Sequence, residues 1–308
     1  MRNPAGGLGR PSPTLSILPA ALLAGALIAL LGSAVLGLAG LVVRSVAARA
    51  AAAGAYSGAP HGWIPLGGSA LASIGHAGTL LALVLLAGWL ALRTVAAARA
   101  PWANLHEFSV AFAAVLLAAY AVVERRHAIR PLAPLVAALA AGLVGVALSL
   151  DAPVEPLVPA LQQPLLLTVH VGSALLAYAI SAVAFVAAIG ELLARAAGDR
   201  VSALPTADAC RRAAHHAVLV GFPILTAAIA LGSVWANLAW RSYWSNDPKE
   251  LAAAATWLVY GAYLHAAGRR DRWGRCAPWL LVVGFGGVLF TYLAASFLFV
   301  GEHSYAGA

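Results

Sequence analysis

Segment 232–250 combines residue types that suit a flat ligand. Its aromatic side chains fall within ten positions: Trp235, Trp240, Tyr243 and Trp244. One interpretation is an interfacial belt, because amphipathic rings settle at the depth of the lipid headgroups. The sharper interpretation is an aromatic shelf for a flat, apolar, anionic ligand, since rings offer stacking faces. Lys249 or Arg241 would then pair with carboxylates of that ligand.

The composition indicates that membrane helices position this segment. Of 308 residues, 62% are hydrophobic and only 10% are charged, and the mean hydropathy is +0.86. Soluble domains average roughly 25% charged residues, so a soluble enzyme, a disordered chain and a disulfide scaffold are excluded. Cys210 and Cys276 form no CxxC pair, which favours two reduced, unreactive thiols. The sequence contains no Walker-type loop or catalytic triad.

The apolar runs predict an all-α, polytopic membrane bundle of eight transmembrane helices. A span needs about 20 apolar residues, and helices satisfy their own backbone groups in lipid. The expected spans are 15–43, 68–92, 107–123, 131–150, 169–194, 216–239, 251–267 and 277–300.

Positive residues predict how these spans are oriented. With both termini outside, the cytoplasmic loops collect thirteen Lys and Arg residues and the outside segments six. Cytoplasmic loops are enriched in these residues, so we expect both termini outside, although Arg2 and Arg10 oppose this for the first span. The net charge of +8 is interpreted as this loop bias rather than as nucleic-acid binding. The outside surface would hold loops 93–106, 151–168 and 240–250 and the tail 301–308.

Segment 235–250 resembles the tryptophan-rich WWD signature of the haem-handling proteins of cytochrome c biogenesis. The matching pattern is WAxxAWxxYWxxDPKE. The family usually has Gly where this chain has Arg241, and Trp where it has Asn246. Asp247 and the three residues after it are intact, and we assign Asp247 to the shelf with the aromatic residues.

Other pieces resemble the same family and occur in the right order. They lie at 101–108, 169–178, 221–231, 256–265 and 301–305. The chain therefore resembles the CcsA/ResC type of System II, called CcsB in some bacteria. On this basis we divide it into N-terminal membrane helices (1–98) and a haem-handling membrane domain (99–308).

The resemblance implies a subunit of a cytochrome c synthase, or haem lyase. Such a protein moves haem b to an outside site in the cell membrane and presents it for covalent attachment to apocytochrome c CxxCH segments. The implied partners are a ResB-like membrane subunit, apocytochrome c and thiol-reducing, thioredoxin-like proteins. The alternative is a haem exporter or carrier of the CcmC type without ligase activity. A third alternative, a structural subunit, predicts no haem in the purified protein.

Two histidines flank the Trp-rich loop in the topology drawn from the arginine counts. His170 begins span five and His303 follows span eight, both on the outside. Haem iron is commonly held by imidazole, sometimes by one on each face. We predict that His170 and His303 are the axial ligands of an outer haem, and the alternative is two separate surface histidines.

A deeper histidine predicts an inner site. His265 lies roughly 21 Å along span seven at 1.5 Å per residue, near the cytoplasmic end. An ionisable residue at this depth suggests a function, and the resemblance implies an inner haem ligand whose partner histidine comes from the ResB-like subunit. The alternative is a helix-end histidine that snorkels to the interface. His76 has a comparable depth in span two and is either a second inner ligand or a packed helix residue.

Two further groups of polar residues lie near the ends of the spans. Asn104 and Glu107 are expected to support the outer loop, where Glu107 positions a partner or a cation that binds a haem propionate. His106, between them, is a candidate supporting residue for the same site. At the start of span six, His215 and His216 are interpreted as a solvated basic patch, with haem entry as the alternative.

Overall fold

The computed structural model describes residues 13–52, 66–150, 153–154, 164–198, 203–269 and 272–294. Over these residues the chain forms eight α-helices and no strand, which confirms the all-α prediction. The helices are α1 (Pro13–Ala52), α2 (Leu66–Ala97), α3 (Leu105–Glu124), α4 (Ala133–Leu148), α5 (Pro164–Ala197), α6 (Ala207–Trp240), α7 (Pro248–Ala267) and α8 (Arg272–Leu289). A 3-10 turn (Arg130–Leu132) precedes α4, and a π-helical turn (Phe290–Ala294) follows α8.

Seven of the described helices are long and apolar enough to cross a bilayer, in agreement with a polytopic membrane bundle. The exception is α7, the predicted span seven, because its first turn is charged and its last turn holds His265. Several helices run past the expected spans. The N-terminus of α6 lies nine residues before 216, since the Thr206 side chain accepts a hydrogen bond from the backbone N–H of Ala209 and starts the helix early.

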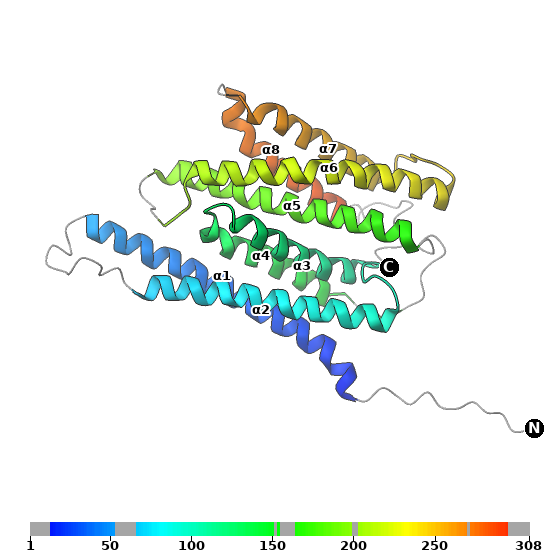
Figure 1. The fold of residues 1–308 in the computed structure, drawn as a ribbon, viewed down its shortest axis with the longest axis horizontal. Coiled ribbons are helices and arrows are strands. Elements are labelled where there is room, and N and C mark those ends of the chain that lie inside the picture. Colours follow the sequence, from blue (N-terminus) through cyan, green and yellow to red (C-terminus); the bar gives the residue numbers. More distant parts are fainter. Residues whose placement is uncertain are drawn as a thin grey trace, which may run out of the picture.

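Successive helices run antiparallel, so that their connections gather at two ends of the bundle (Figure 1). The α1–α2 pair packs on α4 through α1, α3 and α4 pack together, and α5 packs on α3, α6 and α8. Helix α7 contacts α6 and α8. Helices α2 and α7 lie on opposite sides of the central layers (Figure 1).

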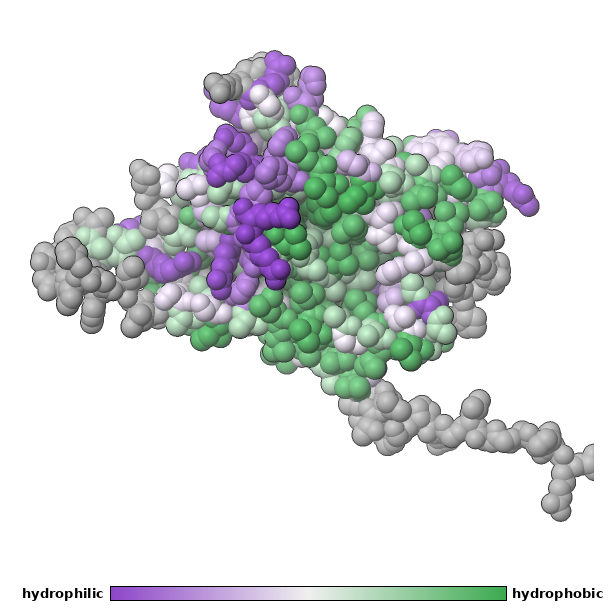
Figure 2. Space-filling model, in the orientation of Figure 1, coloured by the Kyte–Doolittle hydropathy of each residue, from purple (hydrophilic) through white to green (hydrophobic). Residues whose placement is uncertain are grey.

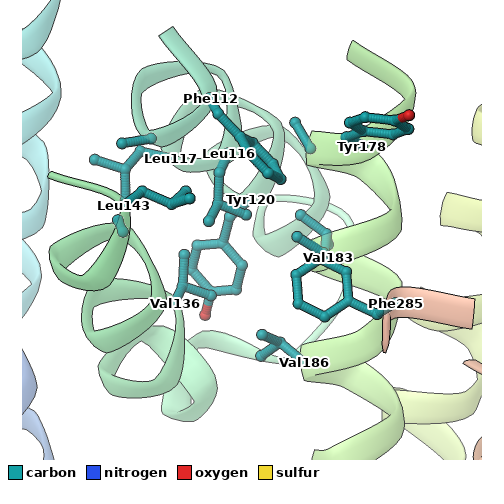
Figure 3. Close-up of a cluster of buried hydrophobic side chains, with 14 of the residues drawn as sticks. Phe112, Leu116, Leu117, Tyr120, Val136, Leu143, Tyr178, Val183, Val186 and Phe285 are labelled. Carbon is teal, nitrogen blue, oxygen red and sulfur yellow. The ribbon is translucent and has the colours of Figure 1, made fainter. Parts of the chain in front are cut away.

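The core lies where α3, α4, α5 and α8 meet (Figure 3). Phe112 and Tyr120 of α3 are buried there, and Phe285 of α8 stacks on Phe185 of α5 with ring centroids 4.7 Å apart. Small residues allow the closest approach elsewhere: a side chain on Gly40 of α1 would come within 2.7 Å of the carbonyl oxygen of Gly68 of α2. Close packing of these helices fixes the positions of the helix ends that carry the site.

We call the two ends of the bundle the site end and the basic end. The site end holds the α2–α3 connection (98–104) and the α6–α7 connection (241–247). The basic end holds the α3–α4 connection (125–129), the start of α6 and the end of α7. Figure 2 shows hydrophilic residues gathered over the basic end beside an apolar belt across the middle of the bundle. This belt is the surface expected to face lipid.

Candidate functional site

A cavity opens at the site end between α5, α6, the start of α7 and the α2–α3 connection. Its empty space is about 1300 Å³, part of which opens to solvent. Its wall is mainly aromatic and aliphatic, with a few polar groups: Trp102, Asn104, Phe108, Leu167, His170, Val171, Tyr178, Leu225, Ile229, Ser233, Trp235, Tyr243, Trp244, Lys249, Glu250, Thr291 and Tyr292.

His170 is held in this wall by a hydrogen bond to the neighbouring helix. Its Nδ1 atom lies 3.0 Å from the carbonyl oxygen of Ala228 in α6. A carbonyl can only accept, so Nδ1 carries the proton and the lone pair of the neutral ring is on Nε2. Metal-binding histidines are usually oriented by this kind of bond.

The ring of His170 has a fixed plane as well as a fixed hydrogen bond. It stacks on Trp235, with ring centroids 6.1 Å apart and an angle of 11° between the planes. Trp240 packs edge-on against Trp235 with centroids 4.7 Å apart, behind the wall of the cavity. A side chain on Gly232 would lie 2.6 Å from Cε1 of His170, so only glycine leaves room for the imidazole here.

The α6–α7 connection brings Tyr243 and Trp244 to the cavity. The Ser233 hydroxyl donates to the carbonyl oxygen of Tyr243 over 2.8 Å, and Nε1 of Trp244 donates to Oδ1 of Asn246 over 2.9 Å. Asn246 therefore stabilises the connection in the position where the family usually has Trp. Two of the four aromatic residues predicted for the shelf reach the cavity from this connection, and Trp235 reaches it from α6.

The side chain of Asp247 hydrogen-bonds to the backbone of this segment and does not line the cavity. Oδ1 of Asp247 accepts from the N–H of Lys249 over 2.8 Å, and Oε2 of Glu250 accepts from the N–H of Asp247 over 3.2 Å. This is a capping box, with Pro248 in the first turn. The intact Asp-Pro-Lys-Glu run is thereby explained by the start of α7.

Arg241 ends α6 in the left-handed conformation, with φ of 61°. This conformation explains why glycine is usual at the position, since a side chain there costs roughly 1–2 kcal/mol. We expect Arg241→Gly to stabilise the protein by about 0.5–1 kcal/mol. Relief of the left-handed strain favours glycine, and the greater conformational entropy of glycine in the unfolded chain offsets part of that effect. The measurement is the thermal midpoint of the purified chain. Asn246→Gly is the comparison: φ there is also 61°, but Asn tolerates it and its Oδ1 accepts from Trp244, so no gain is expected. An equal gain at both positions would contradict the explanation.

The two cations proposed from the sequence have different positions. The Arg241 side chain is exposed and does not line the cavity. Lys249 lies in the wall, and burial lowers the pKa of its ammonium group to about 8, with nearby Asp247 opposing this shift. Lys249 is therefore the cation that the cavity offers to an anionic ligand.

A buried ion-pair cluster holds the α2–α3 connection against the helices. The Glu107 carboxylate is fully buried and accepts from Nε of Arg93 and from Nη1 of Arg99, both over 2.7 Å. It also accepts from the N–H of Ala103 over 3.0 Å, while Oδ1 of Asn104 accepts from the N–H of Glu107 and caps α3. Asn104 and Ala103 line the cavity, so this cluster shapes the cavity from behind.

The two arginines and three further residues that line the cavity carry no signal in the sequence pattern that marks them as part of the site. Thr291 and Tyr292 reach the cavity from the π-helical turn, and Tyr178 reaches it from α5. The Tyr292 hydroxyl lies 2.5 Å from the Ser109 hydroxyl of α3, which ties the turn to the bundle. A local π-helical turn has no clear sequence signal, although such turns are frequent at functional sites.

Three further histidines considered from the sequence lie away from the cavity. His76 of α2 lies 3.5 Å from the Glu124 carboxylate of α3, whereas His265 is exposed on α7, on the opposite side of the bundle (Figure 1). The structure thus does not bring these two histidines together. His106 turns its Nδ1 toward the carbonyl oxygen of Ala147, 2.8 Å away, and does not line the cavity. His303 lies outside the described residues.

Fold and site together define a multi-pass membrane protein with an aromatic cavity whose wall contains one oriented imidazole. Residues 102–303 match the family model described as Cytochrome C assembly protein. The chain belongs to this cytochrome c assembly protein family, which confirms the resemblance to CcsA-type cytochrome c biogenesis proteins.

Individual relatives agree with the family assignment. The cytochrome c biogenesis protein CcsA of Synechococcus elongatus is 32% identical over 287 residues, which covers 76% of this chain and 88% of the relative. CcsA of Thermosynechococcus vestitus is 47% identical over 102 residues, or 33% of this chain and 32% of the relative. The solved structure of the cytochrome c heme lyase CcmF has a TM-score of 0.61 at 20% identity, covering 94% of this chain and 49% of that one, a likeness of fold.

Proposed function

We propose that this chain is the haem-handling subunit of a System II cytochrome c synthase, which binds haem b in the cavity and presents it to apocytochrome c. The observation that carries the proposal is His170, an imidazole whose Nδ1–H donates to the Ala228 carbonyl and whose ring stacks on Trp235. The site end would face the outside of the cell membrane, because Lys and Arg are more frequent in the loops of the opposite end.

The cavity suits an iron porphyrin with carboxylates. The aromatic walls match the flat macrocycle, Lys249 matches a propionate, and the histidine supplies one axial ligand. His303 is proposed as the second ligand. It follows the π-helical turn, whose Thr291 and Tyr292 line the cavity, and the nine residues from Ala294 to His303 reach up to roughly 30 Å when extended.

Attachment itself adds each cysteine thiol of the apocytochrome across a vinyl group of haem, which forms a thioether and needs reduced thiols. The residues of this chain would bind the haem, orient its vinyl edge and keep water from the iron. Thioredoxin-like proteins would keep the thiols reduced, and a ResB-like subunit would complete the complex. His265, exposed on α7, is proposed as an inner haem ligand that meets a partner histidine. His76, paired with Glu124, would serve only a separate site.

A reconstituted complex separates this proposal from a carrier of the CcmC type. With its ResB-like partner and a reduced apocytochrome, a synthase yields covalent haem that stays on the polypeptide in denaturing gels. A carrier binds and releases haem without forming thioethers. Absorption spectra of the purified complex, compared with His170→Ala, His303→Ala and His265→Ala, report which histidines hold the iron. A purified complex without haem would contradict both functions.

Recognition of a ligand carboxylate by Lys249 predicts a pH dependence. Affinity for iron-free protoporphyrin IX should fall by up to about tenfold from pH 7 to 9. The pKa of Lys249 is about 8, and above that pH the protonated fraction of its amine falls tenfold for each pH unit. Quenching of porphyrin fluorescence measures this affinity. Lys249→Arg keeps the charge and should give a flat profile, and a fall that persists in Lys249→Arg would assign the effect to another group.

A further inference from the structure

Two histidines from distant parts of the chain meet at the basic end. His127 lies in the α3–α4 connection and His216 in α6, 89 residues further along the chain. Nδ1 of His216 lies 3.1 Å from Nε2 of His127, and the ring centroids are 4.9 Å apart. Neither residue lines the cavity of the site end, and the proposed function does not use them.

This contact orients the more accessible ring for ligation. His216 is exposed and His127 is half-buried, so His216 is the imidazole that an external ligand meets. When Nδ1–H of His216 donates to His127, the lone pair of the neutral His216 ring is on Nε2. This is the same tautomer as that of His170, whose Nδ1–H donates to the Ala228 carbonyl. A hydrogen bond from the second ring nitrogen increases the basicity of the ligating nitrogen.

The surrounding charges select an anionic ligand. Arg126 and Arg212 both lie near enough to His127 to act on its charge. Arg211 and Arg212 are exposed and share the single carboxylate of Asp208. Hydrophilic residues cover this end of the bundle in Figure 2. The excess of positive charge repels a bare metal cation and attracts a metal complex that carries carboxylates.

We propose that His216, oriented by His127, binds the iron of a porphyrin whose carboxylates pair with Arg126 and Arg212. We call this first binding site for haem at the basic end the landing site. This inference rests on the proposed function in taking haem as the cargo. It adds a site that is separate from the cavity and from His265, and it assigns His127 a positioning role. Iron ligation by imidazole together with carboxylate pairing distinguishes this ligand from a simple anion.

The test uses the full-length chain with His170→Ala, His265→Ala and His303→Ala, so that the other proposed axial ligands are absent. We expect this protein to bind ferric protoporphyrin IX with the absorption spectrum of an imidazole-ligated iron. Adding His216→Ala should abolish that spectrum, and adding His127→Ala should weaken binding by about tenfold, as loss of an orienting partner does. Iron-free protoporphyrin IX should be insensitive to His216→Ala, because it offers no iron to the imidazole.

Matched arginines supply the control. Arg126→Gln should weaken the binding of both porphyrins, whereas Arg125→Gln, equally exposed in the same connection, should not. Size-exclusion profiles verify that each variant is folded. Unchanged ferric binding in His216→Ala, or no binding in the background without His170, His265 and His303, overturns the landing site. If the unmodified chain binds ferric protoporphyrin in that case, the proposed function stands; if it binds none, the proposed function fails as well.

Discussion

Replacing His170 by alanine is expected to lower the haem affinity of the cavity by more than about a hundredfold and to remove the low-spin spectrum of the haem bound there. Loss of an orienting partner alone costs a metal site about 10–100-fold, so loss of the ligand costs at least as much. The remaining wall still offers Trp235 and Lys249, and His303 still offers one imidazole, so weak binding without ligation by two histidines should persist. Absorption titration with ferric protoporphyrin IX measures both effects when His216→Ala and His265→Ala are present in both proteins compared.

Two controls separate ligation from general damage. His106→Ala removes an imidazole from the same end of the bundle that contacts the Ala147 carbonyl rather than the cavity, so haem binding should not change. Gly232→Ala keeps His170 but pushes a methyl group to 2.6 Å from its ring, so the low-spin signal should weaken. Gly172→Ala, where the added methyl group meets nothing within 4 Å, should leave the signal intact. A wild-type spectrum in His170→Ala would remove His170 from the site.

The sequence predicts the helices well because apolar runs and their breaks are local properties. Three residues of the predicted aromatic shelf, Trp235, Tyr243 and Trp244, line the cavity, and their contact with a ligand stays a prediction. Because successive spans alternate in direction, the connection after α6 and the start of α5 lie at the same end of the bundle. Asp247 is different: its position in a familiar pattern suggested a ligand contact, but its geometry is that of a helix cap.

Contacts between distant segments are what the sequence does not reveal. His76 and His265 have similar depths in their spans, yet depth says nothing about which helices are neighbours, and α2 and α7 lie on opposite sides of the bundle (Figure 1). The meeting of His127 with His216 depends likewise on the packing of the bundle. Arg93 and Arg99 were counted only as loop charges, although both point to one buried carboxylate.

Replacing Glu107, which supplies that carboxylate, is expected to have the second large effect. Glu107→Gln keeps the shape of the side chain but removes the carboxylate charge that the guanidinium groups of Arg93 and Arg99, both mostly buried, share. Removing one partner of a buried pair typically costs about 3–5 kcal/mol, so we expect a loss of this size in the free energy of unfolding. The N–H of Ala103 also loses a charged acceptor, and the α2–α3 connection should loosen at the wall of the cavity. Haem affinity should therefore fall even in the protein that remains folded.

Asp208 offers the matched control, because it too is one carboxylate paired with two arginines. Its side chain is 51% exposed, whereas that of Glu107 is 0% exposed. Exposed pairs contribute about 0–1 kcal/mol, so Asp208→Asn should change the thermal midpoint little. Burial, rather than the number of ion pairs, then decides the cost. Equal losses from the two substitutions would contradict this account, and a stable Glu107→Gln protein with unchanged haem binding would show that the cavity keeps its shape without the cluster.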